Sequence, residues 1–274
     1  MVSIVDGKRY LLTMNTGTVC ITGATSGIGR TYARALAAEG HALILTGRRE
    51  VELRAFAEEL AVPTEVVIGD LRDPEVGSNL AERLAACPDL VMLIHNAGYG
   101  HRNSFLTAPP QDLRDMGELH MQCTATLVHA AVPAIARAHV SGGAVILVSS
   151  LAAFMPAPGP AMYTATKAFM IALGRAIQPD LATRSIRLQV LCPGFTHTDF
   201  HDRLDWSAER RRNRGFVRWM RAEDVVKRSL ARLRRGSPWS DPVYVPGWSN
   251  RLLLIMTRLL PRRLYLYLIS RFRF

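Results

Sequence analysis

Residues 18–30 read TVCITGATSGIGR, and this stretch decides the fold. Its first five residues form a short apolar run, which predicts a buried strand, and its end begins a helical pattern. The glycines between them, Gly23, Gly27 and Gly29, let the backbone approach a phosphate group closely. The N-terminus of the helix that follows favours negative charge. The stretch therefore predicts a strand–turn–helix unit that binds a nucleotide.

The alternation of short apolar runs with longer helical stretches continues to residue 192. Strands are expected at 18–22, 41–46, 64–68, 90–95, 144–149 and 187–192, with helices at 28–39, 50–61, 74–86, 111–138 and 161–182. A further helix is expected at 222–235 and a short strand at 243–245. Runs such as ALILT and LVMLI lack strict alternation of apolar and polar residues, which is typical of strands buried on both faces. The pattern predicts an α/β fold, a doubly wound parallel sheet with helices on both faces.

The composition is that of a globular protein, with 49% apolar and 21% charged residues among 274. This length suits a single domain over 1–274. The four cysteines, at positions 20, 87, 123 and 192, show no CxxC pattern and no histidine at ligand spacing. We therefore expect reduced thiols in a cytoplasmic protein and no metal site. Residues 1–17 lack the long apolar run of a signal peptide, and none is expected.

The glycine spacing TGxxxGxG resembles that of the short-chain dehydrogenase/reductase family, and further motifs over residues 18–200 follow in the family's order. They are Asp70-Leu71 after the third strand, Asn96-Ala97-Gly98 after the fourth, Ser149-Ser150 after the fifth, YxxxK from Tyr163 to Lys167, and Pro193-Gly194 with Thr198 after the sixth. The resemblance implies a Rossmann-type sheet of about seven strands in the order 3-2-1-4-5-6-7. It also implies a nicotinamide cofactor, held by Gly23, Thr25, Ser26, Gly27, Ile28, Gly29, Asp70, Leu71, Asn96, Ala97, Gly98, Tyr163, Lys167, Pro193, Gly194, Thr196 and Thr198.

The spacing of Tyr163 and Lys167 indicates their chemistry. Four residues apart on a helix, the two side chains lie on one face. A cation at ~4 Å is worth up to ~4 kcal/mol at an effective dielectric of 20, or about 3 pKa units before desolvation is subtracted, which would bring the pKa of the phenol near 7. Such a tyrosine can protonate a carbonyl oxygen during hydride transfer. The resemblance adds Ser150, thirteen residues before Tyr163, as the hydroxyl that orients the carbonyl.

One position departs from the family's pattern. The family has an asparagine about thirteen residues before a proline, where it helps to hold a water that links the lysine to solvent. Counting back from Pro133 places His120 there. A histidine can donate or accept a hydrogen bond near neutral pH, so His120 can serve the same relay. The alternative is that this position has drifted and the ring only packs inside its helix.

Cofactor choice is expected to depend on the end of the second strand, which reads Leu45-Thr46-Gly47-Arg48-Arg49. An NAD enzyme needs an acidic residue there to bind the ribose 2′-hydroxyl, and Gly47 stands in its place. Arg48 offers a planar guanidinium suited to a 2′-phosphate, with Arg49 or Ser26 in support. NADP(H) is therefore the expected cofactor. The alternative is two solvated arginines that open a surface helix.

The end of the chain is strongly basic. Residues 1–200 carry 16 basic and 17 acidic side chains, whereas residues 201–274 carry 18 and 6. Residues 200–222 are expected to form an irregular loop over the substrate. The extension 248–274 is expected to form two short amphipathic helices, which suit either a membrane surface or packing against protein. No base-reading module accompanies the charge, so nucleic acid is not an expected partner.

These features predict an NADP(H)-dependent oxidoreductase that transfers a hydride to or from a carbonyl or alcohol carbon. The small-molecule substrate is expected to be fairly apolar, such as an acyl, polyketide or sterol-like compound. Apolar side chains expected at the mouth of the site are Phe154, Met155, Phe195, Phe200 and Trp206. A homodimer or homotetramer is expected. The alternative is a non-enzymatic NADP-binding sensor or scaffold whose basic tail binds a partner or a membrane.

Overall fold

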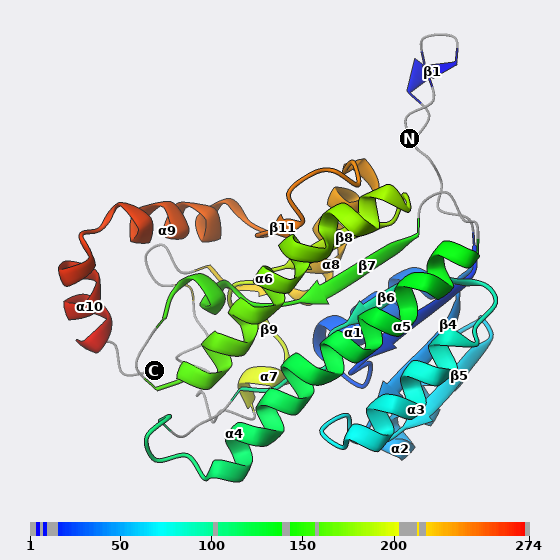
Figure 1. The fold of residues 1–274 in the computed structure, drawn as a ribbon, viewed down its shortest axis with the longest axis horizontal. Coiled ribbons are helices and arrows are strands. Elements are labelled where there is room, and N and C mark those ends of the chain that lie inside the picture. Colours follow the sequence, from blue (N-terminus) through cyan, green and yellow to red (C-terminus); the bar gives the residue numbers. More distant parts are fainter. Residues whose placement is uncertain are drawn as a thin grey trace.

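A seven-stranded parallel sheet forms the centre of the molecule (Figure 1). The computed structural model describes residues 4–5, 8–9, 16–100, 104–138, 143–156, 159–202, 213 and 218–271. In spatial order the strands are β11 (Val243–Tyr244), β8 (Arg187–Leu191), β7 (Ala144–Val148), β6 (Leu90–His95), β3 (Thr18–Thr22), β4 (Ala42–Gly47) and β5 (Thr64–Ile68). All neighbours pair in parallel. Taken in chain order, these strands confirm the predicted arrangement 3-2-1-4-5-6-7.

Helices cover both faces of the sheet, as the buried strands require. One face carries α3 (Pro74–Ala85), α5 (Cys123–Arg137) and α6 (Ala161–Thr183), and the other carries α1 (Gly27–Ala37), α2 (Glu50–Glu58) and α8 (Ala222–Arg235). Leu80, Leu127 and Met170 are fully buried on the first face. Leu36 and Phe56 are fully buried on the second. Burying a side chain of this size contributes about 1.5–3 kcal/mol, so each face has its own apolar layer.

The helix expected over 111–138 differs from the prediction in its middle. It consists of α4 (Pro110–Gly117), a π-helical turn η1 (Glu118–Gln122) and α5. A π-helical turn adds one residue to the helix, which rotates the residues after it relative to those before. Hydrophobic periodicity does not reveal a single inserted residue. The turn carries His120, so this difference bears on the site.

Short elements complete the structure, and most were not predicted. They are the hairpin β1 (Ile4–Val5) and β2 (Lys8–Arg9), the 3₁₀ turn η2 (Leu151–Phe154), the pair β9 (Thr196–His197) and β10 (Met220–Arg221), and α7 (Asp199–Asp202). The loop expected at 200–222 lies largely outside the described residues, and Trp206 lies outside them entirely.

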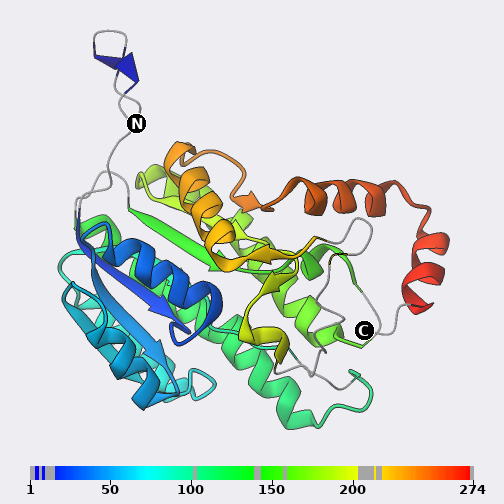
Figure 2. The same cartoon turned by 180° about the vertical axis from the view of Figure 1, so that it is seen from behind.

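The two helices expected at the C-terminus are present as α9 (Trp248–Leu259) and α10 (Arg262–Arg271). Pro261 separates them because it lacks the N–H that a continuous helix needs. Both views show the pair leading away from the sheet (Figures 1 and 2). Among the described residues, no helix is long and apolar enough to cross a bilayer.

Candidate active site

The candidate site lies at the carboxyl ends of the strands, where turns from separate strands meet. The Asn96 side chain donates to the carbonyl oxygens of Thr22 (3.1 Å) and Gly23 (3.0 Å). The backbone N–H groups of Asn96 and Ala97 both donate to the Thr22 hydroxyl at 3.0 Å. These bonds fix the turn after β6 against the glycine turn after β3.

The glycine turn has the geometry that a pyrophosphate needs. Gly23 and Gly27 have φ values of +68° and +56°, which side chains rarely adopt. α1 starts at Gly27 without a side-chain cap from Ser26 and without an acidic residue in its first turn. The N-terminus of α1 therefore presents backbone N–H groups and a positive dipole end with no internal anion beside it. The residues present fit a dinucleotide.

The segment that follows β8, the sixth strand of the sheet along the chain, contacts the same glycine turn. A side chain at Gly27 would lie 3.0 Å from the Thr198 side chain, so the two segments are in contact. The Thr196 hydroxyl donates to Gly194 O at 3.0 Å and shapes the turn after Pro193. Asn250 from α9 lies directly against Gly194, where there is no room for a side chain. Sequence reasoning missed Asn250, because no motif marks it.

Ser150, Tyr163 and Lys167 come together as the sequence predicts. Ser150 ends the turn after β7, and its hydroxyl bonds the Tyr163 phenol and accepts from the backbone N–H of Ala152 at 3.1 Å. Lys167 Nζ donates to Val148 O at 2.9 Å and lies 5.9 Å from the centre of the Tyr163 ring. Strand β7 and helix α6 thus place a hydroxyl, a phenol and an ammonium in one site.

The electrostatics of Tyr163 differ from the expectation. Burial raises the pKa of Tyr163 to about 12, and the hydrogen bond with Ser150 offsets only part of this rise. Burial also lowers the pKa of Lys167 to about 8. The expected pKa near 7 for the phenol is therefore wrong for this geometry. Lys167 Nζ donates to Val148 O, its charge is not among the causes that shift the pKa of the phenol, and burial dominates.

His120 lies buried in the π-helical turn with both ring nitrogens bonded. Nε2 accepts from the backbone N–H of Tyr99 at 3.1 Å, so the ring proton is on Nδ1. Nδ1 then donates to the Thr166 hydroxyl at 2.9 Å. That hydroxyl in turn donates to the backbone carbonyl oxygen of Tyr163. Burial, then the charge of Lys167, lowers the pKa of His120 well below its usual value, so the ring is neutral.

Gly98 keeps a space open between His120 and Lys167. A Cβ at Gly98 would lie 3.0 Å from His120 Nε2 and 3.2 Å from Lys167 Nζ. Both nitrogens therefore border the same small volume, and the imidazole does not point away from the ammonium. Both ring nitrogens of His120 are already bonded, to Tyr99 N–H and to the Thr166 hydroxyl, so in this arrangement the ring has no lone pair or proton left for a bridging water, and the relay stays a prediction.

His95 is a further buried imidazole, and sequence reasoning gave it no role. The Thr22 hydroxyl accepts from two N–H groups, so its own proton is directed to His95 Nδ1 at 3.1 Å. Burial, then the charge of Lys167, lowers the pKa of His95 to about 3. A neutral ring beneath the two turns is therefore part of the scaffold of the site. The sequence signal that could have identified His95 was its position directly before the Asn96-Ala97-Gly98 motif.

Arg48 and Asp70, predicted from separate motifs, lie side by side. Arg48 is half exposed after β4, and its Nη1 is 3.3 Å from Asp70 Oδ2. Arg72 bonds the same carboxylate, through its backbone N–H at 3.0 Å and its guanidinium at 2.6 Å. Burial would raise the pKa of Asp70, but these bonds lower it overall. Arg49 instead pairs with Glu52 at 2.5 Å.

The aromatic side chains expected at the mouth of the site lie in different surroundings. The Phe200 ring lies 5.9 Å from the Tyr163 ring, whereas Phe195 stacks on Trp219 at 5.3 Å. Phe154 is half buried, with the guanidinium of Arg258 5.8 Å from its ring centre. Of the side chains expected at the mouth, Phe200 is thus placed beside Tyr163.

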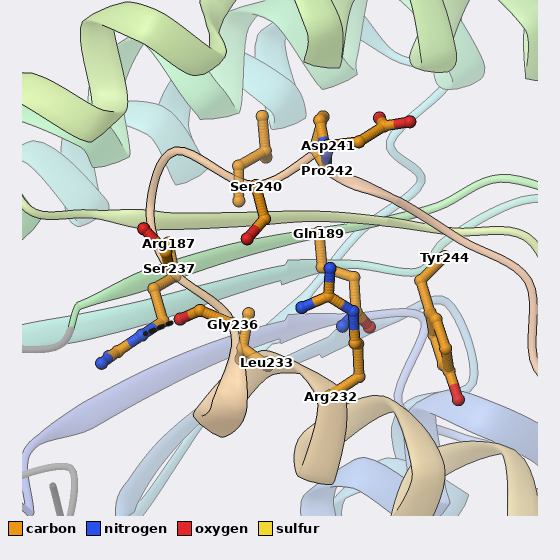
Figure 3. Close-up of a pocket in the computed structure, with 11 residues that line it drawn as sticks. Arg187, Gln189, Arg232, Leu233, Gly236, Ser237, Ser240, Asp241, Pro242 and Tyr244 are labelled. Carbon is orange, nitrogen blue, oxygen red and sulfur yellow. Dashed lines mark hydrogen bonds between the residues drawn. The ribbon is translucent and has the colours of Figure 1, made fainter. Parts of the chain in front are cut away.

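A separate hollow lies at the start of β8 (Figure 3). Arg187, Gln189, Arg232 and Ser240 line it, and Arg187 Nε donates to Gly236 O at 3.2 Å. None of the predicted site residues lines this hollow. It is therefore not part of the candidate active site.

Comparisons with known proteins agree with this geometry. Residues 17–208 match the family model described as short chain dehydrogenase. Sulfoacetaldehyde reductase 2 of Chromohalobacter salexigens is 33% identical over 66% of this chain and 73% of its own. The mouse protein named inactive hydroxysteroid dehydrogenase-like protein 1 is 29% identical over 83% of this chain and 72% of its own.

A solved structure of a short-chain dehydrogenase from Sphingobium yanoikuyae in complex with NADPH matches with a TM-score of 0.76. It is 27% identical, and the match covers 94% of this chain and 96% of the other. Residues 17–208, which the family model matches, include the glycine turn, the Ser150 turn and helix α6 with Tyr163 and Lys167. The chain therefore belongs to the short-chain dehydrogenase family of oxidoreductases.

Proposed function

We propose that this chain is an NADPH-dependent reductase of ketones or aldehydes on fairly apolar substrates. The observation that carries the proposal is the bonded Ser150–Tyr163 pair with Lys167 behind it. When bound, NADPH supplies the hydride that reaches the carbonyl carbon. The proton for the carbonyl oxygen must then come from the protein, and Tyr163 is its source.

Each of the three side chains has a distinct task in the proposal. The Ser150 hydroxyl donates to the carbonyl oxygen and orients it. The Tyr163 phenol transfers its proton to that oxygen as the alkoxide forms. The Lys167 ammonium, within the same buried volume, stabilises the phenolate that remains, because a nearby cation favours the charged form.

With a pKa of about 12, Tyr163 holds its proton at physiological pH, as a proton donor must. A phenol with this pKa is neutral at physiological pH, which is the form that donates a proton. Oxidation of an alcohol needs the phenolate, and its population grows as the pH rises toward 12. We therefore expect reduction to be favoured near pH 7 and oxidation to gain rate at alkaline pH.

The test is NADPH consumption on a panel of ketones and aldehydes. Tyr163→Phe should abolish turnover while NADPH binding stays nearly intact, and Tyr267→Phe, a half-exposed tyrosine on α10, is the matched control. Ser150→Ala should lose about 10²-fold or more in kcat. Turnover above a few per cent in Tyr163→Phe would refute the assignment of the proton donor.

The preference for NADPH is part of the proposal and is supported by the surroundings of Arg48. No carboxylate stands at Gly47, and a Cβ there would lie 3.0 Å from Thr25 Cγ2, so the position has little room for an acidic side chain. Arg48 is half exposed and only loosely paired with Asp70, which leaves its guanidinium able to bind a 2′-phosphate.

Fluorescence titration tests this preference. NADPH should bind at least tenfold more tightly than NADH, which corresponds to about 1.4 kcal/mol. Arg48→Ala should weaken NADPH binding much more than NADH binding, and Arg54→Ala, on the exposed side of α2, should change neither. Equal affinities for the two cofactors in the unaltered protein would exclude the preference.

A second candidate function is nucleotide binding without catalysis. The similarity to a mouse protein named as inactive, which extends over 83% of this chain, is the observation that favours it. The two functions differ in one result. A chain that binds NADPH but oxidises none of it with any carbonyl compound in the panel would be a binding protein.

A further inference from the structure

The outer face of the two C-terminal helices is the largest concentration of exposed apolar side chains in the described part of the chain. Seven of the eleven large apolar residues that are exposed there belong to α9 and α10. Leu259 is 79% exposed, and Leu266 is 52% exposed. The others used below are Ile255, Met256, Leu264 and Tyr267, all at least 40% exposed. We call the exposed apolar surface to which these six side chains contribute the arm surface.

The inner side of the same helices is attached to the body of the protein. Leu254 is buried, and the Tyr265 hydroxyl donates to Pro156 O at 2.8 Å. The guanidinium of Arg258 lies over the Phe154 ring. The helices are therefore held in place by one side, and packing within the described residues does not cover the arm surface. Figure 2 shows both helices standing out from the sheet.

Charge distinguishes between the possible occupants of this surface. After Asp241 the sequence contains no acidic residue, and α9 and α10 with the residues after them carry six arginines. Arg263 is exposed beside the apolar residues of α10. Two copies of such a segment would repel each other. An anionic lipid surface attracts it and also accepts the apolar side chains at the boundary of headgroups and acyl chains.

We propose that the arm surface binds the surface of a bilayer that contains anionic phospholipid. Apolar side chains enter the headgroup region, and the arginines contact lipid phosphates. Neither helix has the length to span a bilayer, so the protein lies on the membrane. This attachment does not depend on which carbonyl compound the chain reduces, or on whether it reduces one.

The test is flotation of the full-length protein with lipid vesicles at about 0.1 M salt. Vesicles of phosphatidylcholine with about 30% phosphatidylglycerol should carry the protein upward at least fivefold more than phosphatidylcholine alone. Leu259→Glu and Leu266→Glu should each lower binding about tenfold or more. Val51→Glu is the matched control, because Val51 is 83% exposed on α2, away from the arm. It should bind as the unaltered protein does.

Charge reversal gives an independent measurement. Arg263→Glu should lower binding about fivefold or more, since each basic residue near such a surface contributes about fivefold to affinity. Arg228→Glu on α8 makes the same charge change elsewhere and should have a smaller effect. Circular dichroism melts of all variants show whether the fold is intact, and any variant that melts early is replaced by its serine counterpart.

Three results would overturn the proposal. One is no flotation of the unaltered protein with anionic vesicles. Another is equal flotation with both kinds of vesicle, or equal flotation of Leu259→Glu and Val51→Glu. The third is that the unaltered protein binds no vesicles and forms an oligomer, measured by light scattering, which the Leu259→Glu change dissociates. That last result would assign the arm surface to a second copy of the chain.

Discussion

Lys167 is buried at a cost to the stability of the folded chain. Burial lowers its pKa from 10.5 to about 8, so the folded protein disfavours the ammonium form. Below pH 8 both folded and unfolded chains hold the proton, and the cost is fully present, up to ~3 kcal/mol. Between pH 8 and 10.5 the unfolded chain binds more protons than the folded one. The contribution of Lys167 to stability therefore improves as the pH rises through this window.

Lys167→Met should raise the free energy of unfolding at pH 7 by about 1–2 kcal/mol, because it removes a buried charge but leaves Val148 O without its donor. The difference in free energy of unfolding between the variant and the unaltered protein should be smaller near pH 10, where the lysine of the folded unaltered protein is neutral. Urea denaturation at the two pH values measures it. Turnover should be lost in the same variant. A variant less stable than the unaltered protein at pH 7 would contradict this explanation.

His120 links the segment after Asn96 to the catalytic helix. His120→Ala should lose about tenfold or more in kcat, because Tyr99 N–H and the Thr166 hydroxyl both lose a partner. His120→Asn should keep most activity, since an amide can accept from one group and donate to the other. If His120 moves a proton, the pH profile of kcat changes in the asparagine variant. Unaltered turnover in His120→Ala would leave the ring with a packing role alone.

The sequence predicts the site residues that belong to local motifs and misses those that act across elements. Tyr163 and Lys167 follow from spacing on one helix, because helix geometry fixes their common face. Arg72 and Thr166 have no such signal, since each also bonds a side chain of another segment, Asp115 of α4 and His120 of η1. The pKa of Tyr163 was predicted wrongly, because sequence spacing gives the position of a cation but not the burial of the phenol.

At the scale of elements, the packing of α1 against the first turn depends on a missing side chain. A Cβ on Gly29 would overlap Gly23 O and lie 2.5 Å from Asn96 Nδ2. Gly29→Ala should therefore destabilise the protein by about 1–3 kcal/mol and weaken NADPH binding, because the backbone cannot yield without opening the turn. Thermal unfolding and cofactor titration measure the two effects.

Gly117→Ala is the matched control for this prediction. Gly117 has helical φ and ψ, and a Cβ there meets only Met162 Cε at 3.4 Å, an ordinary contact. This change should stabilise the protein by about 0.4–1 kcal/mol, because it reduces the conformational freedom of the unfolded chain. Equal destabilisation by both alanines would mean that the close approach at Gly29 is not what restricts the turn.

The long elements are predicted well, and the irregular ones are not. The strands and helices follow from the hydrophobic pattern, because a strand buried on both faces leaves a continuous apolar run and a helix buried along one side leaves a helical period. The π-helical turn at 118–122 leaves no such period, although it places His120 against Thr166. The two-residue strands β9 and β10 were missed as well, although β11, which is equally short, was predicted at 243–245.

At the scale of the whole molecule, the four cysteines report on one of the two apolar layers. Cys20, Cys87, Cys123 and Cys192 are all buried in the layer between the sheet and helices α3, α5 and α6. Burial raises the pKa of Cys123 and of Cys192 to about 12. None of these thiols is therefore expected to be ionised or accessible in the folded protein at neutral pH.

A thiol reagent should accordingly measure the opening of this layer. In the native protein at pH 8, Ellman's reagent should not modify any of the four thiols on mixing, and in urea it should modify all of them. If the layer opens as one cooperative unit, the slow native reaction should proceed with a common rate. NADPH at about 100 times its Kd should slow that rate about a hundredfold, since it stabilises the folded state by ~2.7 kcal/mol. A thiol that reacts at once, or whose rate of modification is the same with and without NADPH, would show that its part of the layer opens independently of the cofactor site.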